Sequence, residues 1–157
     1  MTALYQKILL PLDGSEFAAE ALPHAEAMAF SSQAKLVLFQ VVEEIQDFAL
    51  EQTKSLGIPT VAHDESKQNQ ALDAAQSYLD ELIASLRHRQ IDASADMGSG
   101  DPATAIVEYA RHEGVDLIVM STHGRTGLAR WAYGSVAHKV LQAAPCAVLV
   151  VRPSNFR

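Results

Sequence analysis

Hydrophobic positions along this chain follow two alternating periods, a pattern that predicts strands alternating with helices. Apolar runs of strand length stand at Ile8–Leu12, Leu36–Val42, Leu117–Met120 and Cys146–Val151. The segment Ile91–Met97 alternates apolar and polar residues instead. Such alternation is typical of an edge strand that has one face wetter than the other.

Between these runs, apolar residues recur at helical spacing. They are Ala18, Leu22, Ala25 and Ala29 in a helix over Ser15–Ala29; Ala71, Ala75, Tyr78, Leu79, Leu82, Ile83 and Leu86 in a helix over 67–89; and Ala103, Ile106, Val107 and Ala110 in a third. Asp101 suits the N-cap of the third helix, and Pro102 suits its first position. A last helix is expected at Ser135–Ala144. The polar segment Glu43–Ser66 is expected to be a long loop with room for a short helical piece.

Strand and helix units with short connections predict an α/β fold, a parallel sheet with helices on both faces. We expect one domain over residues 1–157. Ligands of open α/β sheets bind beyond the carboxyl ends of the strands, where the strand order reverses. Three segments can reach that place: Asp13 at the end of the first strand, the end of the second strand, and the loop after Met120.

Composition narrows the class of protein. Apolar residues make up 48% and charged residues 20%, which is ordinary for a soluble globular domain. The apolar runs are far shorter than the ~20 residues of a membrane span. The first seven residues lack the layout of a secretory signal, so we expect a cytoplasmic location. The single cysteine, Cys146, is expected to be a small buried thiol rather than a nucleophile.

Charge is distributed unevenly. All 19 acidic residues lie at or before Asp116, whereas five cationic residues and no acidic one follow it. An arginine-bearing loop without acids suits a polyanionic ligand, although a short loop can also lack acids by chance. The sequence pI near 5.2 argues against a nucleic-acid surface, which needs a broad basic face.

The segment Ser121–Ser135 carries the most specific chemistry. Its glycines Gly124, Gly127 and Gly134 let backbone N–H groups approach an anion, and the following helix N-terminus favours phosphate. The carboxylate of Asp13 can accept hydrogen bonds from a ribose or an amino group; alternatively it caps the helix that follows. The chain has no Walker loop, no histidine pair at i, i+4 spacing and no evident nucleophile–base pair, so the pattern favours a nucleotide binder over a zinc protein or a dedicated enzyme.

Five motifs together resemble the universal stress protein family over nearly the whole chain. They are Lys7–Ser15, Gly98–Ala103, Asp116–Gly127, Gly134–Ala137 and Pro145–Arg152, in the order and spacing of that family. The ATP-binding branch carries Gly-x2-Gly-x9-Gly-Ser/Thr. Here Gly124 and Gly134-Ser135 match the pattern, whereas Ser121 replaces its first glycine.

The resemblance implies a sheet of order 3-2-1-4-5, an adenine-nucleotide alpha hydrolase-like fold, and a bound ATP or other adenine nucleotide with Mg²⁺. By the same resemblance, Pro11 and Asp13 contact the adenosine, the backbone at Val41 holds the adenine edge, and Met120 and Ser121 line the base and ribose. The remaining implied residues surround the phosphates: His123, Gly124, Arg125, Gly134, Ser135 and Val136.

The resulting hypothesis is a stress-response sensor or regulator that binds ATP and at most hydrolyses it slowly. The alternatives are a family member that acts through protein contacts without ATP, and a small-molecule hydrolase or transferase on the same fold. The resemblance also leaves the last strand at a sheet edge. Because Ala147–Val151 holds no charge and no proline, we expect a homodimer through this strand.

Overall fold

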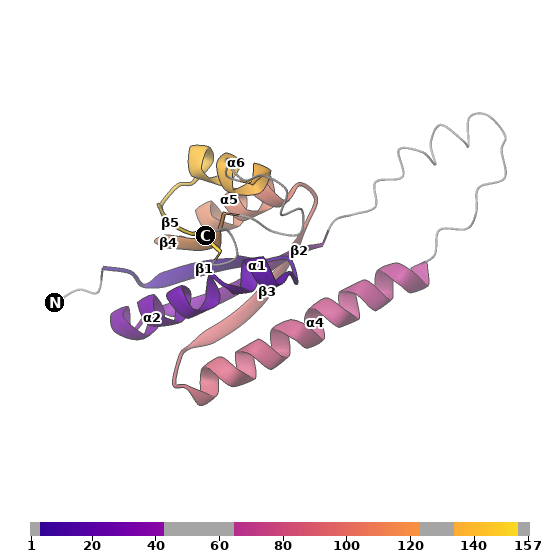
Figure 1. Ribbon diagram of the computed structural model, residues 1–157, viewed down its shortest axis with the longest axis horizontal. Coiled ribbons are helices and arrows are strands. Elements are labelled where there is room, and N and C mark those ends of the chain that lie inside the picture. The colour runs from indigo at the N-terminus through magenta and orange to yellow at the C-terminus, as the bar shows by residue number, and fades with distance from the viewer. Residues whose placement is uncertain (1–3, 43–64, 123–133, 154–157) are drawn as a thin grey trace.

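A five-stranded parallel sheet of order β3-β2-β1-β4-β5 organises the computed structural model, which describes residues 4–42, 65–122 and 134–153. Its strands are β1 (Lys7–Leu12), β2 (Lys35–Val42), β3 (Ala93–Ser99), β4 (Leu117–Ser121) and β5 (Ala147–Val151). Its helices are α1 (Glu16–Ala19), α2 (Leu22–Ser32), α4 (Glu65–His88), α5 (Pro102–His112) and α6 (Ser135–Ala143). The expected fold class and strand order are both confirmed (Figure 1).

Helices cover both faces of the sheet, and each face has its own core (Figure 1). Because successive strand residues point to opposite faces, Leu10 packs beneath α2 and α4 whereas Leu9 packs beneath α5 and α6. The apolar stripe expected on α4 reaches the first core through Leu79 and Leu86, both fully buried. Within the described residues, no helix is long and apolar enough to cross a membrane.

The helix expected over Ser15–Ala29 is in fact two helices, and Pro23 explains the break. The first helix ends at Ala19, four residues before Pro23, and the second begins at Leu22 with the proline in its first turn. A proline inside one continuous helix would leave the carbonyl group of Ala19 without its donor and would clash with it. The first helix therefore ends before the proline, and a second helix begins.

The edge strand also begins later than expected, at Ala93 rather than Ile91. Ile91 instead lies in the turn that closes α4, because its backbone N–H donates to the carbonyl oxygen of Leu86 at 3.1 Å. Gln90 supplies the reversal with a φ of +62°. The strand continues to Ser99, since Gly98 and Ser99 still pair with the end of β2.

Two side chains occupy outward-facing backbone groups of β3, which is one edge of the sheet. The N–H of Leu36 donates to the carbonyl of Asp92, so Ala93 and Met97 direct their own backbone groups away from β2. The Arg87 guanidinium donates to the carbonyl oxygen of Ala93 at 3.1 and 3.2 Å. The Asp96 carboxylate accepts the N–H of Met97 at 2.9 Å. This edge is therefore partly blocked to further strand pairing.

The N-cap expected at Asp101 is confirmed. Its carboxylate accepts the backbone N–H of Thr104 at 3.0 Å and the Thr104 hydroxyl at 2.8 Å. Pro102 lies in the first turn of α5, as expected. At the other end of the sheet, Cys146 is half-buried, and burial followed by the negative charge of Asp116 raises the pKa of its thiol. The thiol is therefore less ionised than a free one at neutral pH, which fits an unreactive role.

Candidate functional site

The pairing between β1 and β4 ends early, at Leu9–Ile118. Lys35 donates to the carbonyl of Gln6, so even-numbered residues of β1 bond to β2 and odd-numbered residues face β4. The next donor toward β4 after Leu9 would be residue 11, and Pro11 has no N–H. β1 and β4 are also the strands between which the order of the sheet reverses. Pro11 thus ends the ladder at the position where open α/β sheets bind ligands.

Asp13 follows directly on β1 and forms a tight turn. One of its carboxylate oxygens accepts the Ser15 backbone N–H at 2.9 Å and the Ser15 hydroxyl at 2.5 Å. Gly14 has a φ of +77°, a conformation that favours glycine. The N-cap of α1 is Ser15, whose hydroxyl oxygen accepts the N–H of Ala18 at 3.1 Å. Asp13 therefore holds the capping residue and is not itself the cap.

The end of β2 brings two different groups to this region. Val41 directs its backbone toward β1, whose last residue paired with β2 is Leu12. Its neighbour Gln40 is 6% exposed, and its Oε1 atom is buried without a hydrogen-bond partner among the described residues. A buried unpaired acceptor is rare in native proteins and marks a position that is not selected for stability alone.

The first turn of α6 carries no negative charge and no side-chain cap. Gly134 is its N-cap, and in the described structure no side chain hydrogen-bonds the first N–H groups. Ser135 is exposed and Val136 half-buried. The Gly134 N–H donates to the carbonyl oxygen of Thr122 at 2.7 Å, which holds this helix start beside the end of β4. Backbone N–H groups at such a helix start can bind an anion.

The end of β4 presents Met120 and Ser121 in different ways. The Met120 side chain is buried in the core beneath α5 and α6, which leaves its backbone as the part able to meet a ligand. Ser121 is the last residue of β4 and pairs with Val151. Within the described residues, positive φ values outside glycine occur at Gln33 and Gln90. The backbone at residue 121 is therefore extended, and serine in place of glycine costs no strain there.

His123, Gly124 and Arg125 lie outside the described residues, so their expected roles remain predictions. The structure brings together the other expected residues at the carboxyl ends of β1, β2 and β4 and at the start of α6: Pro11, Asp13, Val41, Met120, Ser121, Gly134, Ser135 and Val136. Among the described residues, no group of three or more His, Cys, Asp or Glu residues could hold a metal ion.

Tyr78 is a neighbour of this region that sequence reasoning did not select. Burial raises the pKa of its phenol, and the negative charge of Asp13 raises it further. Because the charge of Asp13 acts on this phenol, Tyr78 on α4 lies near the turn after β1. The sequence indicated Tyr78 only as part of an apolar stripe, and nothing in its spacing linked it to Asp13.

Comparisons with known proteins agree with this arrangement. A sequence model of the universal stress protein family matches residues 4–152. The universal stress protein MJ0531 of Methanocaldococcus jannaschii is 35% identical over 95% of this chain and 83% of its own. The solved structure of MJ0577, from the same organism, is 29% identical, covers 97% of this chain and 99% of its own, and superposes with a TM-score of 0.79.

Two more distant structures contain adenine nucleotides. One is a universal stress protein in complex with cAMP, 22% identical over 94% of this chain and 97% of its own, with a TM-score of 0.64. The other is a universal stress protein family protein of Arabidopsis thaliana with AMP bound, 16% identical over 96% of this chain and 97% of its own, also with a TM-score of 0.64. At these identities the likeness shows a shared fold.

Proposed function

This chain belongs to the universal stress protein family, and from that premise we propose that it binds an adenine nucleotide, ATP above all, as a stress-response regulator. The observation that carries the proposal is the end of β1–β4 pairing at Pro11, opposite an α6 N-terminus that no side chain caps in the described structure. A missing ladder donor and a row of helix-start N–H groups suit a ligand that has a base at one end and phosphates at the other.

The chemistry of the individual groups supports this assignment. The Val41 carbonyl oxygen faces the β1 side beyond the last paired residue, Leu12, and can accept a hydrogen bond from the amino group of a base. The Asp13 carboxylate can accept ribose hydroxyls while it holds the turn at Ser15. The N–H groups at Ser135 and Val136 and the Ser135 hydroxyl can donate to phosphate. His123, Gly124 and Arg125 would complete the phosphate end, and Mg²⁺ bound with the nucleotide would supply positive charge to the phosphates.

Related structures support the ligand class. Relatives of the same fold carry cAMP or AMP, both of which share the adenosine moiety with ATP. The most direct experiment is native mass spectrometry of the purified protein, followed by calorimetric titration with ATP, AMP and cAMP, with and without Mg²⁺. We expect micromolar binding of ATP with Mg²⁺. No heat, and no displacement of a fluorescent ATP analogue by any of the three at millimolar concentration, would overturn the proposal.

We also propose a homodimer through β5. The N–H of Thr122 donates to the carbonyl of Val151 at 2.9 Å, so Ala147, Leu149 and Val151 bond to β4. The backbone groups of Val148 and Val150 therefore point away from the sheet. Val148, Leu149 and Val150 are half-exposed and apolar. The same strand of a second copy, antiparallel about a two-fold axis, would pair these groups and cover the side chains.

A further inference from the structure

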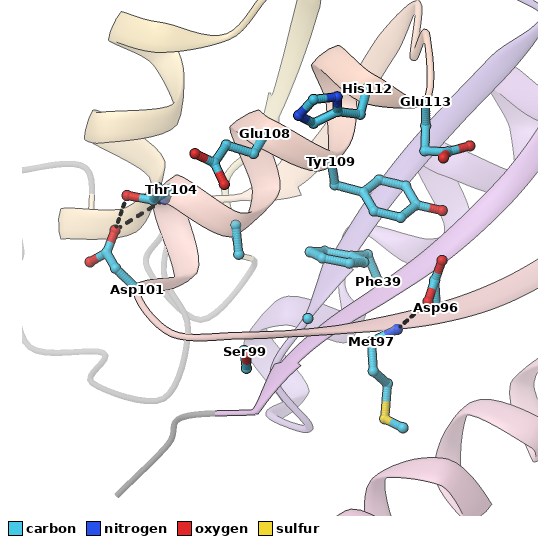
Figure 2. Close-up of a pocket in the computed structure, with 12 residues that line it drawn as sticks. Phe39, Asp96, Met97, Ser99, Asp101, Thr104, Glu108, Tyr109, His112 and Glu113 are labelled. Carbon is cyan, nitrogen blue, oxygen red and sulfur yellow. Dashed lines mark hydrogen bonds between the residues drawn. The ribbon is translucent and has the colours of Figure 1, made fainter. Parts of the chain in front are cut away.

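A groove of about 400 Å³ lies between α5 and β3, on the sheet face opposite α4 (Figure 2). It contains none of the residues assigned to the nucleotide. On β3, Asp96 and Gly98 direct toward α5, because Ala93, Ala95 and Met97 belong to the core on the other face. An exposed aspartate and a glycine leave this end of the face without large covering side chains.

The floor of the groove is aromatic. Phe39 is 2% exposed, and the Tyr109 ring packs over it with a centroid separation of 4.5 Å and an interplanar angle of 33°. Gly98 makes room for this pair, because a Cβ atom there would come within 2.7 Å of the Phe39 Cζ atom. The position of the rings thus depends on a residue without a side chain.

The rim of the groove is acidic. It carries the carboxylates of Asp96, Asp101, Glu108 and Glu113, and none of the residues that line it, all within the described part of the chain, is Lys or Arg. Lys139 pairs with Asp101 at 3.2 Å, and Lys7 pairs with Glu113 at 3.3 Å, both in exposed bridges. Glu108 has no ion-pair or hydrogen-bond partner among the described residues.

Tyr109 keeps its proton throughout the physiological range. Burial, followed by the negative charge of Asp96 and a hydrogen bond with it, raises the pKa of the phenol to about 12. Figure 2 shows Tyr109 above Phe39, with Asp96 and Glu113 toward its hydroxyl end and Asp101 at the opposite end of the groove. A neutral ring flanked by carboxylates suits a cation that is also flat.

We propose that this groove docks a basic peptide segment of a partner protein, anchored by an arginine that packs against Tyr109 and pairs with Glu108. A guanidinium is planar, stacks on aromatic rings and matches carboxylate geometry with two parallel hydrogen bonds. An ammonium is a compact point charge that pairs with a carboxylate without this geometric match. The rim carboxylates have the opposite charge to such a segment, and those of Asp101 and Glu113 are shared with Lys139 and Lys7 in exposed bridges.

The spacing of the rim favours a peptide over a single small cation. Asp101, Glu108 and Glu113 follow one another along α5, so at 1.5 Å per residue they span about 18 Å. One arginine side chain reaches one part of this length. An extended peptide rises about 3.3 Å per residue, so a second basic residue three positions along reaches the next carboxylate, about 10 Å away.

The test is titration of isotope-labelled protein with an acetylated, amidated Arg-Gly-Gly-Arg peptide at low ionic strength, followed by NMR. Matched probes replace both arginines with lysine or with the uncharged isostere citrulline, and spermine serves as the small polycation. We expect the arginine peptide to shift the signals of Phe39, Gly98 and Tyr109. The lysine peptide is expected to bind at least fivefold more weakly, and the citrulline peptide is expected not to bind.

Protein variants locate the contact. Glu108→Gln is expected to weaken arginine-peptide binding at least fivefold, and Glu108→Lys to abolish it. Glu81→Gln, an exposed site on α4 at the other face, is the control and is expected to change nothing. ATP titration of each variant reports separately on the nucleotide site. The proposal is overturned if Glu81→Gln and Glu108→Gln act alike, if citrulline binds as well as arginine, or if spermine binds tighter than the peptide.

Discussion

The backbone N–H of Gly134 donates a 2.7 Å hydrogen bond to the carbonyl oxygen of Thr122. The bond ties the residue after β4 to the N-cap of α6. Thr122 is anchored in turn, because its own N–H donates to the carbonyl of Val151 at 2.9 Å. The start of α6 is thereby fixed relative to the sheet, as a preorganised anion site requires.

The first prediction concerns this helix start. Ser135→Ala removes one hydroxyl and is expected to weaken ATP binding by about 1 kcal/mol. Gly134→Val places a branched side chain where the proposed phosphate would approach the N–H groups, and it is expected to abolish binding. Calorimetry checks both, with circular dichroism to verify folding. Equal and small effects of the two substitutions would mean that α6 does not hold phosphate.

A second prediction separates the phosphate end of the ligand from its base. Arg125→Ala is expected to weaken ATP binding by about 1–3 kcal/mol through loss of a charge-assisted contact, and to leave adenosine binding unchanged. Competition titrations with both ligands measure the difference. Lys54→Ala, which removes a positive charge elsewhere in the chain, is the control. Parallel losses for ATP and adenosine would contradict a phosphate contact.

The third prediction follows from the unpaired oxygen of Gln40. An apolar residue of similar shape removes the cost of burying an unsatisfied acceptor, so Gln40→Met is expected to keep or raise the free energy of unfolding, by up to about 2 kcal/mol. Urea unfolding measures it. The exposed Gln70→Met is the control, with a change within about 0.5 kcal/mol. Marked destabilisation by Gln40→Met would mean that the amide has a partner that stabilises the fold.

A fourth prediction uses the N-cap of α5. The backbone hydrogen bond from Thr104 is the main cause that lowers the pKa of Asp101, followed by the Thr104 hydroxyl and Lys139. The carboxylate therefore stabilises the fold above its unfolded-state pKa near 4, and the stabilisation is lost as pH falls through the lower folded value. Asp101→Ala is expected to cost about 0.5–2 kcal/mol at pH 7.

Urea unfolding across pH checks that dependence. The difference between the wild-type chain and Asp101→Ala is expected to shrink steadily as pH falls below 4. Asp92→Ala, an exposed carboxylate that lies outside the helix, serves as the comparison. A difference that stays constant down to pH 2 would show that the charge of Asp101 has no part in the cap.

The fifth prediction tests the dimer with a pair of prolines. The backbone of Val150 points outward, so Val150→Pro removes an N–H group that would donate to the partner strand. The hydrogen bonds between β5 and β4 stay intact. Leu149 donates inward, so Leu149→Pro is expected to destabilise the sheet itself. Light scattering of Val150→Pro is expected to give a folded monomer of about 17 kDa. A wild-type chain that is already monomeric at high micromolar concentration would contradict the dimer.

Much of the fold was predictable because its signals are local. Apolar runs such as Leu117–Met120 and the cap at Asp101 depend on neighbouring residues, and the structure confirms them. The break before Pro23 was also encoded locally, but the apolar spacing of Ala18 and Leu22 continued across it and concealed it.

The unpredicted part of the site depends on tertiary neighbours. Gln40 lies beside Leu12 and Met97 only because β2 runs between β1 and β3, and no spacing within β2 indicates a buried amide oxygen without a partner. The same holds for Tyr78, whose link to Asp13 crosses from α4 to the turn after β1. Sequence patterns place residues on elements, whereas such contacts require the elements to be assembled.

The two edges of the sheet differ in a way that limits self-assembly. Arg87 and Asp96 occupy backbone groups along β3, whereas Val148 and Val150 leave theirs directed outward along β5. A molecule with two open edges could add copies at both ends and grow into a filament. In the proposed dimer, a copy that joins through β5 would present only its own partly blocked β3, which would oppose further growth.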